Sequence, residues 1–169
     1  AWNWRSPATH SHEFPDAAMD RIAALTRFAD HALGGLDGPP TAASADASFR
    51  SYWRVSRQGQ SYIVMNAPPD KEDVAPFVDI AARLNAAGLN APKVLAEDRA
   101  LGFLLLTDLG TRTYLPELNP DSVDALYGDA LQALQQMQTA VRCDGLPAYD
   151  AERLRTEMQL FDTWFLERH

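Results

Sequence analysis

The most constraining feature of this 169-residue sequence is a repeated change between helical and strand-like spacing of apolar residues, with short connections throughout. Apolar positions from residue 16 onward recur every three or four residues, which predicts an amphipathic helix that ends at a glycine pair. Two strand-like runs follow, at residues 52–55 and 62–65, and the segment between them contains Gly59. This spacing predicts a β-hairpin after the first helix.

The same order repeats further along the chain. Apolar residues between positions 74 and 84 share one helical face, and Gly88 follows as a stop. Short apolar runs at 94–95 and 101–106 then flank an acidic turn. A five-stranded sheet needs one more strand, and residues 40–45 can supply it just ahead of the hairpin. Because all these connections are short, we expect an α+β fold with a five-stranded antiparallel sheet and its helices on one face.

The sequence becomes helical after Gly110. Asn119 and Pro120 are typical of a helix start, because asparagine caps the exposed amides and proline is tolerated at the first helical position. An apolar stripe follows over residues 123–141, and Asp150 is a candidate cap for a last helix. We expect both apolar stripes to pack into a core.

Charge and composition exclude several classes of protein. A net charge of -8 argues against nucleic-acid binding, and no apolar run approaches the roughly 20 residues of a membrane helix. We therefore expect a soluble, cytoplasmic protein, in which the single cysteine, Cys143, is a small apolar filler. Residues 1–18 are set aside as a disordered tail or upstream read-through, where His10 and His12 lack the partners of a metal site.

Three segments carry a resemblance to a known family: residues 47–55, 62–69 and 102–110. In this order they resemble the aminoglycoside phosphotransferase superfamily, which includes choline kinases. Within it they look most similar to the bacterial N-acetylmuramate/N-acetylglucosamine anomeric kinases of cell-wall recycling. Residues 160–165, followed by His169, match the helix that precedes the catalytic region in those sugar kinases.

The resemblance implies a protein-kinase-like N-terminal lobe over residues 19–110, with a hinge at 107–110. It implies the start of a helical C-terminal lobe over residues 111–169, which this chain does not complete. The expected activity is ATP-dependent phosphoryl transfer to the anomeric hydroxyl of a small sugar, with Mg²⁺ neutralising the phosphate charge. The missing lobe and the sugar acceptor are then the partners of this chain. Apolar residues of the last two helices should pack against that lobe, so we expect them to be exposed in this chain alone and to promote self-association.

The resemblance also implies nucleotide contacts in two segments. The loop at residues 46–51 lies where the family covers the phosphates, although it lacks the glycines of protein kinases, and an ordinary polar hairpin tip is the alternative. The linker at 107–110 matches the segment whose backbone binds the adenine edge, and a simple hinge is the alternative. The candidate nucleotide-binding residues are Ser48, Phe49, Arg50, Met65, Thr107, Asp108, Leu109 and Gly110.

Met65 occupies the position where kinases usually carry a strand lysine that pairs with phosphate oxygens. The only lysines in the sequence, Lys71 and Lys93, are out of register with this strand. Arg50 or Arg54 is the candidate for a phosphate contact in its place, and a solvated strand face is the alternative for these arginines.

No catalytic or metal-binding residue is expected within this chain. The superfamily uses a His-x-Asp motif with an asparagine five residues after the aspartate, and none of the four histidines begins such a motif. We expect the general base and metal ligands beyond His169, so that this chain alone is inactive. Two alternatives stay open: a kinase for another acceptor, such as an aminoglycoside, choline or homoserine, and a non-catalytic nucleotide-binding or interaction module.

Overall fold

The computed structural model describes residues 16–45 and 48–166. Residues 1–15 of the expected tail, which include both histidines, lie outside these ranges. Residues 16–18 belong to helix α1, which begins at Asp16. The elements, in chain order, are α1 (Asp16–Leu33), β1 (Thr41–Ala45), β2 (Ser51–Arg57), β3 (Gln60–Asn66), α2 (Ala75–Ala86), β4 (Val94–Asp98), β5 (Phe103–Thr107), α3 (Tyr114–Glu117), α4 (Val123–Ala140), α5 (Ala151–Phe161) and a π-helical turn η1 (Asp162–Leu166).

The five strands form one antiparallel sheet in the order β1-β2-β3-β5-β4, which confirms the expected α+β fold with a five-stranded sheet. The hairpin between β2 and β3 is tighter than the apolar runs suggest. Gln58 and Gly59 are its two turn residues, and both have positive φ angles, 52° and 75°. Such a two-residue turn matches the twist of the strands, so the pairing extends further than the apolar residues alone indicate.

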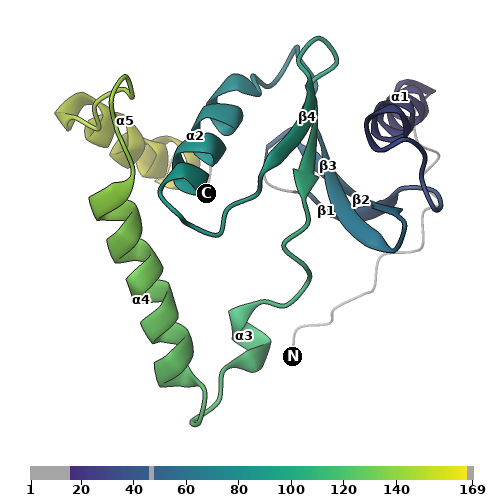
Figure 1. Cartoon of the computed structure of the whole chain (residues 1–169). Helices are drawn as coiled ribbons and strands as arrows, with labels where there is room; N and C mark the ends of the chain where they lie inside the picture. The colour runs from purple at the N-terminus through teal and green to yellow at the C-terminus, as the bar shows by residue number, and fades with distance from the viewer. Residues whose placement is uncertain (1–15, 46–47, 167–169) are drawn as a thin grey trace, which may run out of the picture.

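The helices cover both faces of the sheet, so the expectation that they lie on one face was wrong (Figure 1). Leu25 and Ala29 of α1 pack against one face, and Phe77 of α2 packs against the other. The reason is visible in β5, where the four residues from Phe103 to Leu106 are each at most 2% exposed. Successive strand residues point to opposite faces, so a strand that is buried throughout needs cover on both.

The segment after β5 also differs from expectation at one point. The long helix α4 begins at Val123 rather than at Asn119, and the short helix α3 precedes it. The Oδ1 atom of Asn119 accepts hydrogen bonds from the amides of Asp121 and Ser122, so Asn119 caps a turn instead of the helix. The last helix starts as expected, because Asp150 accepts hydrogen bonds from the amides of residues 152 and 153.

Helices α4 and α5 stand apart from the sheet (Figure 1). In the part of the chain that the structure describes, neither helix has a buried residue, so their stripes form no core within this chain. Their large apolar side chains are exposed, as expected for surfaces that await the missing lobe. Gln136 holds α4 to the end of α2 by a 2.7 Å hydrogen bond to the carbonyl oxygen of Ala87. Cys143 is exposed, so it does not fill a core as expected. Among the described helices, none has both the length and the apolar character that a bilayer crossing requires.

Candidate functional site

A cleft of about 560 Å³ opens on the α2 face of the sheet. Its wall includes one residue from each of β2, β3, β5 and α2, respectively Tyr52, Ile63, Leu106 and Phe77. The sheet register explains why the strand residues gather there: Ile63 lies opposite Leu106 across β3 and β5, so their side chains share one face. The cleft therefore has a largely apolar wall of sheet residues and one helix, to which Ala43 and Ser44 of β1 also belong.

The linker that follows β5 forms the polar rim of this cleft. All four residues that the sequence analysis assigned to the linker, from Thr107 to Gly110, line the cavity. The hydroxyl of Thr107 accepts a 2.9 Å hydrogen bond from the amide of Lys93, and the two residues also share a backbone hydrogen bond of 3.0 Å. The structure thus brings half of the predicted nucleotide contacts together at one site.

Asp108 makes an ion pair across the cleft wall with Arg54 of β2. The guanidinium donates through Nε to Oδ2 at 2.6 Å and through Nη2 to Oδ1 at 3.1 Å. The hydroxyl of Ser61 in β3 donates to the same carboxylate, as does the amide of Gly110 at 2.8 Å. Only 7% of the Asp108 side chain and 30% of the Arg54 side chain are exposed.

These contacts explain the electrostatics of the pair. The hydrogen bonds from Arg54 hold the pKa of Asp108 well below its usual range, and those from Ser61 and Gly110 lower this pKa further. The same pairing raises the pKa of Arg54. Arg54, one of the two arginines expected either to contact phosphate or to lie on a solvated strand face, is held by Asp108 at the cleft wall.

Met65 does not line the cleft. Its side chain is fully buried, in a cluster with Leu104, Leu106 and Val74 between the sheet and the start of α2. Position 65 thus serves the core in this structure.

The three candidate residues of the loop between β1 and β2 lie beside a neighbouring cavity rather than in the cleft lining. Arg50 lines this cavity of about 450 Å³, and Phe77 lines both cavities. The amide of Phe49 donates to Glu72 Oε1 at 3.2 Å, and the hydroxyl of Ser48 accepts from the Arg50 side chain at 3.0 Å. Residues 46 and 47 of the predicted loop lie outside the described residues.

Several cleft residues escaped the sequence analysis. Ile63 lies two positions before Met65 on the same strand, so both side chains lie on one face of the sheet. This alternation could have identified Ile63 as a candidate once Met65 was one. Tyr52 was read only as part of a strand, and Phe77 only as part of the apolar face of a helix. Ser61 does not line the cleft but donates to Asp108, and nothing in the sequence pattern singled it out.

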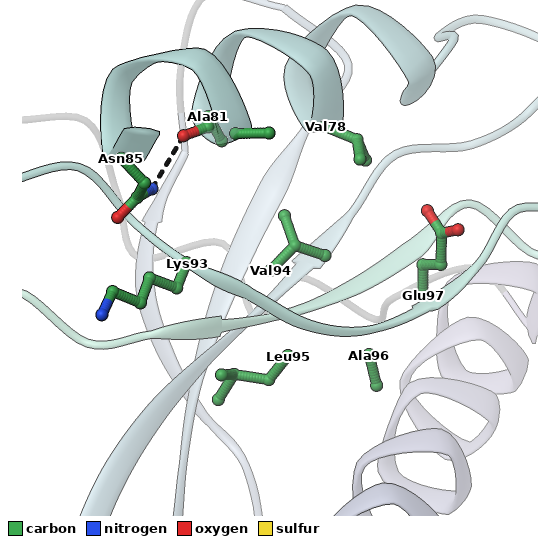
Figure 2. A pocket seen from close by; sticks show the side chains of 9 residues that line it. Val78, Ala81, Asn85, Lys93, Val94, Leu95, Ala96 and Glu97 are labelled. Atoms are coloured by element: carbon green, nitrogen blue, oxygen red, sulfur yellow. Dashed lines mark hydrogen bonds between the residues drawn. The ribbon is translucent and has the colours of Figure 1, made fainter. Parts of the chain in front are cut away.

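A third cavity, of about 450 Å³, lies between α2 and β4 and contains none of the predicted site residues (Figure 2). Figure 2 shows Val78 and Ala81 of α2 above Val94 of β4, with Lys93 and Glu97 at the two ends of the groove. Its lining is mostly aliphatic. No group of three or more His, Cys, Asp or Glu residues suited to a metal ion occurs in the described part of the chain.

Comparisons with known proteins agree with this architecture. The model of the phosphotransferase enzyme family matches residues 40–168. A Pseudomonas aeruginosa protein named N-acetylmuramate/N-acetylglucosamine kinase is 50% identical over 127 residues, which cover 75% of this chain and 38% of that protein. Proteins of the same name from Pseudomonas putida and Neisseria meningitidis are 45% identical over 142 residues and 38% identical over 155 residues.

The matched regions cover 83% and 89% of this chain in the Pseudomonas putida and Neisseria meningitidis proteins, but only 42% and 46% of those relatives. This chain therefore spans less than half the length of these three relatives.

Proposed function

This chain belongs to the phosphotransferase enzyme family, and we propose that it forms the nucleotide-binding lobe of an ATP-dependent sugar kinase. The observation that carries the proposal is the cleft beside the linker from Thr107 to Gly110. An apolar wall that includes Ile63 and Leu106 suits the faces of a flat purine, and the adjacent backbone of the linker suits its polar edge. The cavity volume of about 560 Å³ lies within the ordinary range for small-molecule sites.

The proposed acceptor is the anomeric hydroxyl of N-acetylmuramate or N-acetylglucosamine, and the proposed setting is cell-wall recycling in the cytoplasm. This step rests on the names of the relatives at 38–50% identity. The regions matched by this chain make up only 38–46% of these relatives, so we assign the general base and the acceptor contacts to the remainder of the protein. The chain by itself is then inactive as a transferase.

The fit of the two cofactors to this chain differs. The cleft supplies an apolar wall and backbone groups for the base of ATP, as Thr107 to Gly110 line it. Mg²⁺ would neutralise charge on the transferring phosphate. The described residues hold no cluster of carboxylates for a metal ion, so we assign its ligands to the same remainder of the protein.

One observation favours a second function, that of a nucleotide-binding module without transferase activity. Met65 is fully buried at the position where kinases usually carry a phosphate-binding lysine. Such a module would bind ATP in the same cleft and phosphorylate nothing. A kinase for another acceptor, such as an aminoglycoside, remains the alternative within the family.

The test is phosphoryl transfer by the full-length protein that contains this chain. Labelled ATP and Mg²⁺ are supplied with N-acetylmuramate, N-acetylglucosamine or an aminoglycoside in parallel reactions. Transfer to the two amino sugars alone supports the proposal, and transfer to the aminoglycoside alone contradicts it. Measurable ATP binding without transfer to any acceptor favours the non-catalytic module.

A further inference from the structure

The carboxylate of Asp108 accepts its hydrogen bonds from other groups of the protein. From the described residues, its carboxylate accepts four hydrogen bonds: two from Arg54, one from Ser61 and one from the amide of Gly110. A carboxylate offers about four lone-pair sites, so these contacts use its accepting capacity. The side chain is only 7% exposed. Asp108 therefore has little left to offer a ligand directly, although it lines the cleft.

The contacts of Asp108 continue the sheet where its backbone pairing ends. The backbone pairing of β3 with β5 ends at Tyr62 and Thr107. The next residue beyond this pair is Ser61 on β3 and Asp108 after β5. There a side-chain hydrogen bond takes the place of the ladder. Arg54 adds a connection to β2, 54 positions earlier in the sequence. One carboxylate thus ties the start of the linker to two strands of the cleft wall.

We propose that Asp108 is a positioning residue for the nucleotide base, which fixes the linker along the cleft through Arg54 and Ser61 so that the linker backbone meets the base edge. The inference rests on the proposed function, because it concerns the same cleft. Fixing the linker before binding lowers the ordering cost that a ligand must otherwise meet. The effect therefore falls on affinity for the base and not on contacts to the phosphates or the sugar.

The test separates the base from the rest of the nucleotide in the full-length protein. Asp108→Asn keeps the shape of the side chain but removes its charge. We expect the KM for ATP and the inhibition constant of adenosine to rise about tenfold, a change that corresponds to about 1.4 kcal/mol. Inhibition by inorganic tripolyphosphate, the KM for the sugar and kcat should each stay within about twofold, since none depends on the base edge.

Two further variants sharpen the test. Asp79→Asn is the matched control, because it breaks the Arg83–Asp79 ion pair on α2, and neither residue lines the cleft. It should change none of these constants. The double variant Arg54→Met, Asp108→Asn should bind adenosine about as weakly as whichever single variant binds it more weakly. The reason is that the two side chains act as a unit, so the second substitution has nothing further to remove.

The proposal is overturned if Asp108→Asn is folded and binds adenosine as the unaltered protein does. It is also overturned if the inhibition constants of adenosine and of tripolyphosphate rise by the same factor. If Asp108→Asn does not fold, Ser61→Ala removes one hydrogen bond and keeps the ion pair. It should then raise the adenosine constant measurably, and an unchanged value overturns the proposal. Adenosine binding is measured by calorimetry as well as by inhibition, so a protein that transfers no phosphate contradicts the proposed function without ending this test.

Discussion

The carbonyl oxygen of Ala67 occupies the space that a side chain on Gly102 would need, because a Cβ atom there would lie 1.8 Å from that oxygen. The two residues also share a 2.9 Å hydrogen bond, from the amide of Ala67 to the carbonyl oxygen of Gly102. Gly102 has a φ angle of 71°, which side chains rarely tolerate. This contact joins the end of β3 to the turn between β4 and β5. It lies next to β5, whose buried residues belong to the apolar clusters on both faces of the sheet.

Replacing this glycine should therefore be severely destabilising. Gly102→Ala combines left-handed backbone strain with a clash against backbone, and we expect a loss of about 3 kcal/mol or more in the free energy of unfolding. Gly59→Ala is the matched control, because Gly59 has a φ angle of 75° and nothing within 4 Å of the added carbon. It should cost about 1 kcal/mol. Urea unfolding measures both, and equal losses would contradict the close approach.

Asp108 should make stability depend on pH in the acid range. Because the pKa of Asp108 is lowered in the folded state, the ionised carboxylate stabilises the fold above its unfolded pKa of about 3.9. The stabilisation is lost as the pH falls below that value towards the folded pKa. We expect Asp108→Asn to be about 2 kcal/mol less stable than the unaltered chain at pH 7.

That stability difference should shrink progressively below about pH 4. Urea unfolding at pH 7, 5, 4 and 3 follows it. The control, Asp79→Asn, removes a more exposed pair within α2 and should cost at most about 0.5 kcal/mol at pH 7. A difference between Asp108→Asn and the unaltered chain that stays constant down to pH 3 would speak against the ion pair.

Met65 should behave as a core residue. Its side chain is fully buried, so Met65→Ala leaves a cavity and should cost about 2–5 kcal/mol, whereas Met65→Leu should cost less than about 1.5 kcal/mol. Met65→Lys should be at least as damaging as the alanine variant, because it buries a charge in an apolar cluster. Thermal and urea unfolding give the order. A stable lysine variant with tighter ATP binding would instead show that position 65 reaches the phosphates.

The isolated 169-residue chain should self-associate. Large apolar side chains on α4, α5 and η1 are exposed, among them Leu131 at 65%, Met158 at 74% and Trp164 at 55%. Apolar surface of this extent promotes association in water. We expect oligomers at micromolar concentration and binding of a hydrophobic dye, and both should decrease in the double variant Leu131→Gln, Met158→Gln. A monomer that binds no dye would contradict this expectation.

Four strands were predictable from local apolar runs, whereas β1, with the sequence TAASA, was expected only because a five-stranded sheet needs one more strand. Three sequence segments were enough to identify the family, which the comparisons confirm. The arrangement of the helices was harder to predict. The uninterrupted apolar run from Phe103 to Leu106 already implied burial on both faces, but the short connections suggested cover on one. The start of α4 was misplaced because Asn119 caps a turn with the same chemistry that caps a helix.

The candidate site was predictable only in part. The linker at 107–110 follows directly from the last strand, so its place in the cleft came with the fold. The ion pair between Arg54 and Asp108 joins residues 54 positions apart and depends on the register of the sheet, which the apolar pattern does not specify. The burial of Met65 likewise depends on α2 covering that face.

The central claim is that ATP binds in the cleft beside the linker, and photo-crosslinking of the full-length protein with 8-azido-ATP tests it most directly. Labelled peptides are mapped by mass spectrometry, with and without excess ATP. We predict that the label falls on the cleft residues around Ile63 and Leu109 and disappears under competition. Label that resists ATP, or that falls instead on the groove around Val78 and Val94, would contradict the claim.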